Sequence, residues 1–196
     1  MGRSSVTSPS FAITGLTSNP TIFDHAIKNS SSYDRAIRDY ASKGKSGEEL
    51  FFELALEDLT RAADLFRPVH DRTNGLDGWV SLEVSPLLAH NTASTLAEAK
   101  QLFARANRPN LLIKIPGTKE GLPAIEEAIF AGIPVNVTLL FSPEQYRAVA
   151  EAYMRGIERR IRGWTESKSG IGSFGVREPV GYRGRRQSST RTYEPG

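Results

Sequence analysis

The sequence predicts an α/β fold built on a parallel sheet, as in one wall of a barrel. Short apolar runs of strand length alternate along the chain with stretches of helical periodicity. A helix between consecutive strands returns the chain to the same edge, so the strands run parallel. Polar residues also lie near the carboxyl ends of these strands, where barrel enzymes place their chemistry. The pattern therefore predicts an enzyme site at one mouth of the sheet.

Length and composition limit the class of protein. The chain of 196 residues can bury one core but is short for a closed eight-stranded barrel, which usually takes about 250 residues. There is no cysteine, and the three histidines show no paired spacing, so we expect no metal and no other cofactor. No apolar run approaches the roughly 20 residues of a membrane span, and the start lacks a signal core. We expect a cytoplasmic protein without a membrane partner.

The charge is unevenly distributed along the chain. Residues 1–161 carry 18 Lys and Arg against 19 Asp and Glu, whereas residues 162–196 carry 7 against 3. The second segment mixes Gly, Arg and Ser without an aromatic platform, so we expect no nucleic-acid partner and keep such binding as the least favoured alternative. The predicted organisation is an irregular segment over 1–10, a partial barrel over 11–161 and a low-order basic tail over 162–196.

The first predicted strand covers Phe11 to Thr17 and ends in a turn, Thr17-Ser18-Asn19-Pro20. The proline biases Asn19 toward extended backbone, which would place its amide at the mouth of the strand. An ordinary Asn-Pro turn is the alternative.

Two packing helices are predicted next. The second opens with a capping box of Ser46 and Glu49 and is expected to end near Pro68. The residues expected on the apolar faces are Tyr33, Ala36, Ile37 and Tyr40 in the first helix, and Phe51, Leu54, Ala55, Ala62 and Leu65 in the second.

A second strand is predicted over Trp79 to Ser85. Its apolar residues point one way, while Ser81, Glu83 and Ser85 point the other way. An amphipathic strand with one wet face is the alternative. In a parallel sheet both faces are covered, so a carboxylate such as Glu83 requires a partner or a chemical role.

The stretch from Leu111 to Gly121 carries the most informative residue. A helix over Thr92 to Ala106 precedes it, and an apolar strand then holds Lys114 near its end. An amine that loses its hydration there favours the neutral form and becomes a nucleophile toward a carbonyl. A lysine that protects an exposed sheet edge is the alternative.

The final predicted units repeat the pattern. A helix with Pro123 in its first turn ends at Gly132. The strand predicted over Val135 to Leu140 presents Asn136 and Thr138 on one face and the apolar Val135, Val137 and Leu139 on the other. The last helix starts after Ser142 and is expected to stop near Ile161. Its predicted apolar stripe is Tyr146, Val149, Tyr153 and Ile157.

Four motifs, in this order, resemble those of the transaldolases, specifically the group related to transaldolase and phosphoglucose isomerase fusions. They are Gly15–Phe23, Val80–Pro86, Leu111–Gly121 and Val135–Ser142. The resemblance implies a TIM (β/α)8 barrel, of which this chain would hold about four parallel βα units followed by an irregular C-terminal tail.

The resemblance also implies an activity. A transaldolase of the pentose phosphate pathway transfers a dihydroxyacetone unit from sedoheptulose 7-phosphate or fructose 6-phosphate to an aldose phosphate. By this resemblance Lys114 forms the Schiff base, Glu83 and Thr138 manage proton transfer through a water, and Asn19 and Asn136 bind substrate. The alternatives are a Schiff-base aldolase without transfer and a catalytically inactive transaldolase fragment.

Both ends depart from the family pattern. The family's first strand carries an aspartate, and no residue before Phe11 is acidic, so we expect truncation at the N-terminus. We further hypothesise a frame shift after about Ile161. Codons chosen for Gly170 to Tyr182 and read one base later give Gly-Ser-Val-Ala-Ser-Val-Phe-Val-Ser-Arg-Trp-Asp, which resembles the family's next strand. Sequencing the DNA tests this hypothesis, and we expect self-association through exposed sheet edges and disorder from Arg162 onward.

Overall fold

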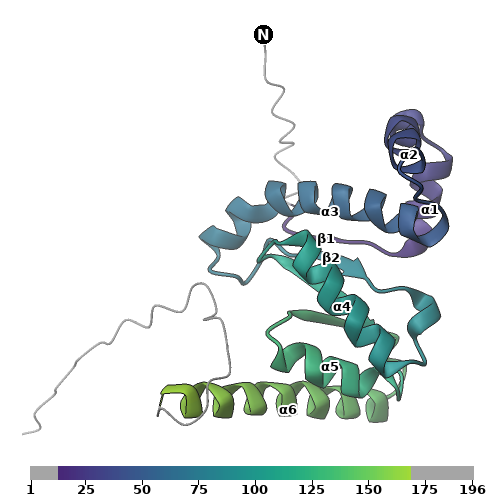
Figure 1. Cartoon of the computed structure of the whole chain (residues 1–196). Helices are drawn as coiled ribbons and strands as arrows, with labels where there is room; N and C mark the ends of the chain where they lie inside the picture. The colour runs from purple at the N-terminus through teal and green to yellow at the C-terminus, as the bar shows by residue number, and fades with distance from the viewer. Residues whose placement is uncertain (1–12, 169–196) are drawn as a thin grey trace, which may run out of the picture.

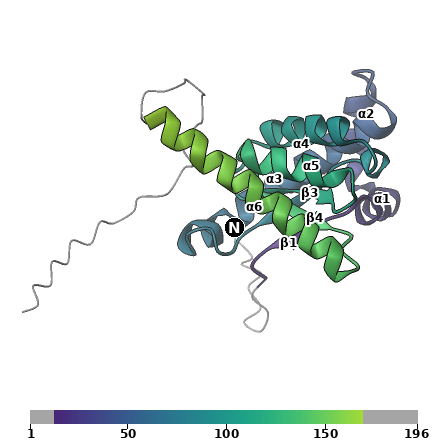
Figure 2. The ribbon, with the colours of Figure 1, turned by 90° about the horizontal axis from the view of Figure 1, so that it is seen from below.

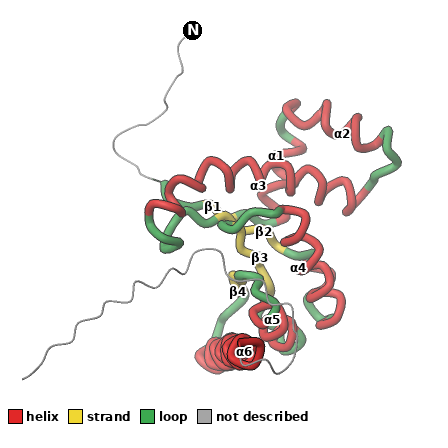
Figure 3. The backbone as a smooth tube through the Cα atoms, turned by 60° about the vertical axis from the view of Figure 1, so that its left-hand side comes forward, coloured by secondary structure: helices red, strands yellow, loops and turns green. Residues whose placement is uncertain are grey.

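The computed structural model describes residues 13–168, which form one parallel sheet with helices along one side (Figures 1 and 3). The strands are β1 (Leu16–Thr17), β2 (Val80–Glu83), β3 (Leu111–Pro116) and β4 (Val135–Thr138). The α-helices are α1 (Pro20–Lys28), α2 (Asp34–Ala41), α3 (Gly47–Arg72), α4 (Thr92–Ala106), α5 (Gly121–Phe130) and α6 (Pro143–Lys168). Two short 3₁₀ helices are η1 (Ser31–Tyr33) and η2 (Pro86–Leu88).

The topology confirms the predicted fold class. The sheet has four strands in the order β1-β2-β3-β4, and every neighbouring pair is parallel. Each strand therefore lies beside the next strand in the sequence, as in the wall of a (β/α)8 barrel. The chain is a partial TIM barrel with four βα units. The sequence predicts a low-order tail from residue 162, but residues 162–168 belong to helix α6, so that part of the prediction is wrong. Residues 169–196 lie outside the described residues.

The core lies between the outer face of the sheet and the helices. Alternate residues of the strands point outward, and the helices cover them with small and branched apolar side chains. The fully buried members include Val80, Leu111, Ile113, Ile115, Ala55, Ala63, Ala99, Ile125 and Ala128. The other set of alternate residues, which includes Lys114, is left for the inner face.

The strands are shorter than the sequence predicts. Within the described residues β1 covers only Leu16–Thr17, and Phe11 lies outside them. The last strand ends at Thr138 because Leu139 adopts a φ of 60°, which leaves the ladder, and Leu139 is half exposed. The prediction that Leu139 continues the apolar face of this strand is therefore wrong.

Helix α3 differs from the prediction at its C-terminus. It passes Pro68 and ends at Arg72. A proline inside a helix removes the bond of its own nitrogen and its ring crowds the carbonyl of the preceding turn, but the turn that follows Pro68 has other support. The Thr73 N–H donates to the Val69 carbonyl, and the ring of His70 packs edge-on against Trp79 with centroids 4.9 Å apart.

The beginning and the packing face of α3 also differ. The capping box does not form, because the Ser46 side chain caps no N–H, and the Glu49 carboxylate instead accepts from Lys45 at 2.8 Å. Leu65 is 79% exposed, since the face that meets the sheet runs through Leu59 and Ala63. The prediction that Leu65 belongs to the core is wrong.

Helix α6 is longer than predicted and packs through smaller residues. It runs beyond Ile161 to Lys168 and crosses the molecule beside α5 (Figure 2). Its buried positions are Val149, Ala152 and Gly156, whereas the predicted Tyr146 and Tyr153 are 66% and 40% exposed. Small residues allow the two helix backbones to approach closely, so the aromatic residues lie on the outer side.

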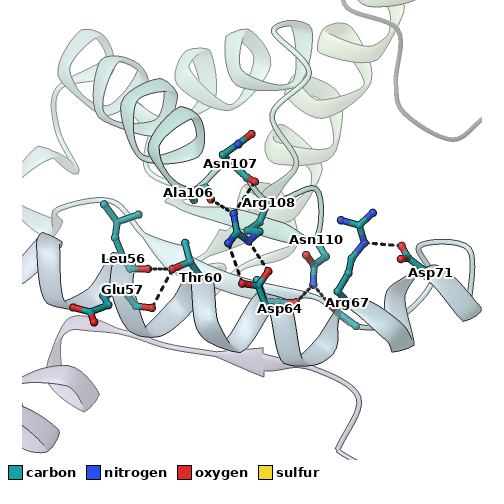
Figure 4. A network of polar contacts seen from close by, with 12 residues as sticks. Leu56, Glu57, Thr60, Asp64, Arg67, Asp71, Ala106, Asn107, Arg108 and Asn110 are labelled. Atoms are coloured by element: carbon teal, nitrogen blue, oxygen red, sulfur yellow. Dashed lines mark hydrogen bonds and ion pairs between the residues drawn. The ribbon is translucent and has the colours of Figure 1, made fainter. Parts of the chain in front are cut away.

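A polar network fixes the entry into β3 (Figure 4). The Arg108 guanidinium binds both oxygens of Asp64 at 2.6 and 2.9 Å, which joins α3 to the turn after α4. Asn110 is fully buried and donates to the carbonyls of Ala63 and Gly78 at 2.8 and 2.9 Å. These contacts set the start of the strand that carries Lys114.

Candidate active site

Three neighbouring strands place one residue each in a row on the inner face. Glu83 of β2 pairs in register with Lys114 of β3, and Lys114 pairs with Asn136 of β4. Register partners in a sheet project to the same side. The row therefore lies opposite the apolar core, near the carboxyl ends of β2 and β3.

Lys114 is enclosed even though the barrel wall has only four strands. The residue is 8% exposed, and its Nζ lies 2.8 Å from the Ser18 carbonyl oxygen and 3.0 Å from Glu83 Oε2. β3 pairs on both sides, so the alternative of a lysine that guards a sheet edge does not apply. The sequence pattern predicts a desolvated amine, and the structure adds a carboxylate and a carbonyl as its hydrogen-bond acceptors.

Two serines that our sequence reasoning did not select complete the surroundings. Ser81 is 3% exposed, and its hydroxyl accepts from Asn136 Nδ2 at 3.2 Å. Its carbonyl accepts from the Ser18 hydroxyl at 2.8 Å. The alternation of β2 placed Ser81 on the same face as Glu83, but a strand pattern alone does not show which residues of other strands it meets.

Thr138 lies two residues beyond Asn136 on the same face of β4. Its Oγ1 is buried, and no described residue makes a hydrogen bond with it. A buried hydroxyl without a protein partner is a place where a water or a ligand group can bind. Thr138 Oγ1 is therefore a candidate hydrogen-bond partner for a water or another small polar group near Asn136.

Asn19 has a different place from the other predicted site residues. Its backbone is extended, with φ of −147°, as the following proline predicts. Its Oδ1 accepts from the Ile22 N–H at 2.8 Å and caps α1. The structure gives no contact between Asn19 and Lys114, whereas the preceding residue, Ser18, does contact the amine.

Hydrogen bonds also tie together the loops that follow β2 and β3. The Thr118 hydroxyl donates to the Ala89 carbonyl, and the Thr92 hydroxyl donates to the Glu120 carbonyl, each at 2.6 Å. The Ser85 N–H donates to Glu98 at 2.6 Å, and burial raises the pKa of the Glu98 carboxyl. These contacts connect the loop after β2 to the loop after β3 and to α4.

Residues 13–168 show neither a metal-binding cluster nor a membrane-spanning helix. No group of three or more His, Cys, Asp or Glu in this part of the chain is arranged to hold a metal ion. No helix in the same part is both long enough and apolar enough to cross a membrane.

The fold and the site define a barrel-type enzyme site with a buried lysine and carboxylate pair. Comparison with characterised families identifies the enzyme family. The profile of Transaldolase/Fructose-6-phosphate aldolase matches residues 5–176. The chain belongs to the transaldolase family, as the four motifs indicated.

Curated relatives are about half identical to this chain. Transaldolase 2 of Streptomyces avermitilis is 50% identical over 166 residues, which cover 84% of this chain and 45% of the relative. The transaldolase of Saccharopolyspora erythraea is 49% identical over 149 residues, 76% of this chain and 40% of the relative. The transaldolase of Thermobifida fusca is 52% identical over 147 residues, 75% and 40% respectively. The chain therefore spans less than half the length of these relatives.

Proposed function

We propose that the chain carries the Schiff-base part of a transaldolase site, acting on sugar phosphates in the cytoplasm as part of the pentose phosphate pathway. The observation that carries this proposal is the buried contact of 3.0 Å between Lys114 Nζ and Glu83 Oε2. A lysine that attacks a carbonyl must first lose a proton, and the carboxylate is in direct reach to take it. Family membership and the position on the inner face both support this role.

The proposed reaction begins with a ketose phosphate, sedoheptulose 7-phosphate or fructose 6-phosphate. The neutral Lys114 amine adds to the ketone carbon, and loss of the carbonyl oxygen as water leaves an imine. Once protonated, the imine accepts the electron pair of the breaking carbon–carbon bond. The hydroxyl on the carbon being released gives its proton, through the bound water, to the Glu83 carboxylate, and that carbon departs as the aldehyde of an aldose phosphate. The enamine of dihydroxyacetone then adds to a second aldose phosphate, and hydrolysis of the new imine frees the lysine.

Glu83 is proposed to move protons in both halves of this cycle. It takes the proton of the Lys114 ammonium and returns a proton to the oxygen that leaves as water. The unpaired Thr138 hydroxyl supports a role in holding the water that takes part in these transfers.

Asn136 and Asn19 are proposed to bind the hydroxyl groups of the sugar. Asn136 stands next to Lys114 in register, which supports contact with a sugar bound to the amine. Asn19 uses Oδ1 as a helix cap, and no described residue accepts from its Nδ2, so that amide end is the one available to a ligand.

The second candidate is an aldolase that uses the same lysine without transfer. It is favoured by the matching family description, which names fructose-6-phosphate aldolase beside transaldolase. An assay with and without an aldose phosphate acceptor separates the two, because only a transaldolase needs the acceptor to turn over.

Reductive trapping tests the shared step. The folded chain is incubated with fructose 6-phosphate, reduced with borohydride and digested, and the adduct is located by mass spectrometry. We expect an adduct on Lys114 that Lys114→Arg abolishes, whereas Lys100→Arg, a change at an exposed lysine of α4, leaves it unchanged. An adduct spread evenly over surface lysines of the folded chain would contradict the proposal.

A further inference from the structure

Ser81 is a hydrogen-bond junction between the first and last strands of the sheet. Its carbonyl accepts from Ser18, which follows β1, and its hydroxyl accepts from Asn136 of β4. The second contact crosses β3 between the register positions of Leu112 and Lys114. A single 3% exposed residue thus connects both neighbours of the amine.

We propose that Ser18 and Ser81 are positioning residues for the Lys114 site. This inference rests on the function proposed above and adds two residues to it. The Ser18 carbonyl that accepts from Lys114 Nζ belongs to the same residue whose hydroxyl is held by Ser81. The hydroxyl contact therefore fixes the carbonyl against which the amine rests.

The other arm of the junction sets the orientation of the Asn136 amide. An amide has a donor end and an acceptor end. The Ser81 hydroxyl occupies the donor end, Nδ2, and no described residue donates to Oδ1. Asn136 then presents an acceptor beside Lys114, which suits a donor group such as the hydroxyl on a carbon next to the reacting carbonyl.

A purely structural role for these serines predicts different results. Ser85 offers the matched control because it follows β2 closely and is 2% exposed, against 3% for Ser81. Its hydroxyl accepts from the Leu87 N–H and is not bonded to Lys114, Asn136 or Ser18. Ser85→Ala removes an equally buried hydroxyl outside the junction.

The first arm of the junction, the contact from the Ser18 hydroxyl to the Ser81 carbonyl, is tested without sugar. Formaldehyde and a hydride reagent methylate Lys114, and the rate of methylation is measured across a range of pH by peptide mass spectrometry. We expect Ser18→Ala to raise this rate about 10-fold, the size expected when a buried hydrogen bond is lost, because a loosened Ser18 carbonyl holds the Lys114 amine less firmly. Ser85→Ala should stay within about twofold. Equal rates for Ser18→Ala and the unchanged chain would overturn this arm.

The second arm, the contact from Asn136 Nδ2 to the Ser81 hydroxyl, is tested with Ser81→Ala. We expect about a 10-fold rise in the fructose 6-phosphate concentration that gives half-maximal trapping, and faster solvent exchange of the Asn136 side-chain amide protons in nuclear magnetic resonance spectra. Combining Ser81→Ala with Asn136→Ala should add little to the effect of Asn136→Ala alone, since both remove one interaction. Unchanged amide exchange would overturn this arm.

These readouts separate the inference from the proposed function. If the unchanged chain traps no sugar, the proposed function fails, while methylation of Lys114 and exchange of the Asn136 amide still decide whether the serines position the site. If a serine variant does not fold, the same arm is read from Ser18→Cys or Ser81→Cys, which keep a side chain of similar size but replace the hydroxyl with a weakly hydrogen-bonding thiol. These variants should shift the readout in the same direction as the alanine variants, and parent values would overturn the arm.

Discussion

Gly156 of α6 lies against Ile129 of α5 so closely that a Cβ on the glycine would stand 2.8 Å from the Ile129 Cβ. It would also stand 2.7 Å from the Glu126 carbonyl oxygen. We expect Gly156→Ala to force the helices apart and to lower the free energy of unfolding by about 2 kcal/mol, in the range for overpacking. Gly163→Ala in the same helix meets nothing within 4 Å and should stabilise by about 0.5 to 1 kcal/mol. Urea unfolding of both variants checks the prediction, and equal effects would contradict it.

Replacing the carboxylate beside the lysine should slow chemistry without removing the lysine. Glu83→Gln keeps an oxygen near Lys114 Nζ but cannot take its proton. We expect trapping of fructose 6-phosphate on Lys114 to slow by about 10² or more, the usual contribution of a general base. Glu49→Gln, at an exposed glutamate of α3, is the control. Trapping by Glu83→Gln at the parent rate would exclude Glu83 as the base.

Replacing the buried Asn110 should lower the free energy of unfolding more than replacing an exposed asparagine. It is fully buried, and Asn110→Ala removes the amide that donates to the Ala63 and Gly78 carbonyls. We expect a loss of about 2 kcal/mol in the free energy of unfolding, measured with urea, since the Gly78 carbonyl loses its donor while the Ala63 carbonyl keeps its bond within α3. The exposed Asn29→Ala, which removes one bond to the His25 carbonyl, should cost about 0.5 kcal/mol or less. A small loss for Asn110→Ala would mean that water replaces the amide.

The attachment of α6 should weaken in acid. Arg155, and then Arg159, hold the pKa of Glu126 below its ordinary 4.5. The contribution of this carboxylate to stability is therefore present above about pH 4.5 and is lost as the pH falls through its lower folded pKa. We expect Glu126→Gln to cost about 1 kcal/mol at neutral pH and to lessen the acid dependence of stability. Urea unfolding at several pH values measures both, and an unchanged acid dependence would contradict the assignment.

An apolar groove at the end of the sheet should promote self-association. It has a volume of about 560 Å³ and is lined by Leu140, Phe141, Ser142, Pro143, Tyr146, Arg147 and Ala150. Phe141 is 82% exposed beside the edge strand β4, and exposed apolar surface at a sheet edge favours contact with other chains. We expect Phe141→Glu to shift sedimentation toward the monomer, whereas Leu76→Glu, at an 86% exposed position between α3 and β2, should not. A parent chain that is monomeric throughout would refute this prediction.

The order of helices and strands could be predicted from the sequence because apolar residues repeat at a different spacing in each type of element. The α4 boundaries at Thr92 and Ala106 agree with the prediction, and so does the end of α5 near Gly132, where a φ of 82° suits glycine. The helix after Pro68 could not be predicted, because its support comes from Trp79, which lies beyond the turn. The packing face of α6 could not be predicted either, since its glycine looks like a helix breaker until its neighbour is seen.

The site likewise contains residues that could be predicted from the sequence and groups that could not. Lys114, Glu83 and Asn136 could be placed on one face from alternation and from the family motifs, and their register agrees. The Ser18 carbonyl could not be selected, because a backbone group leaves no signature in a sequence. The helix cap made by Asn19 uses Oδ1 and leaves Nδ2 for its proposed role at the substrate, and a local Asn-Pro motif does not show this division.

The bond from Lys114 to Ser18 joins residues 96 positions apart. During synthesis the carbonyl is made long before its amine, and the two meet only when β2 and β3 have both paired with their neighbours. Contacts of such long sequence separation slow folding, because the entropy of closing the loop is lost before the contact forms. The reactivity of Lys114 toward reagents in water therefore reports whether the sheet has assembled. In a chain whose sheet is incomplete, the Lys114 amine would be exposed to water.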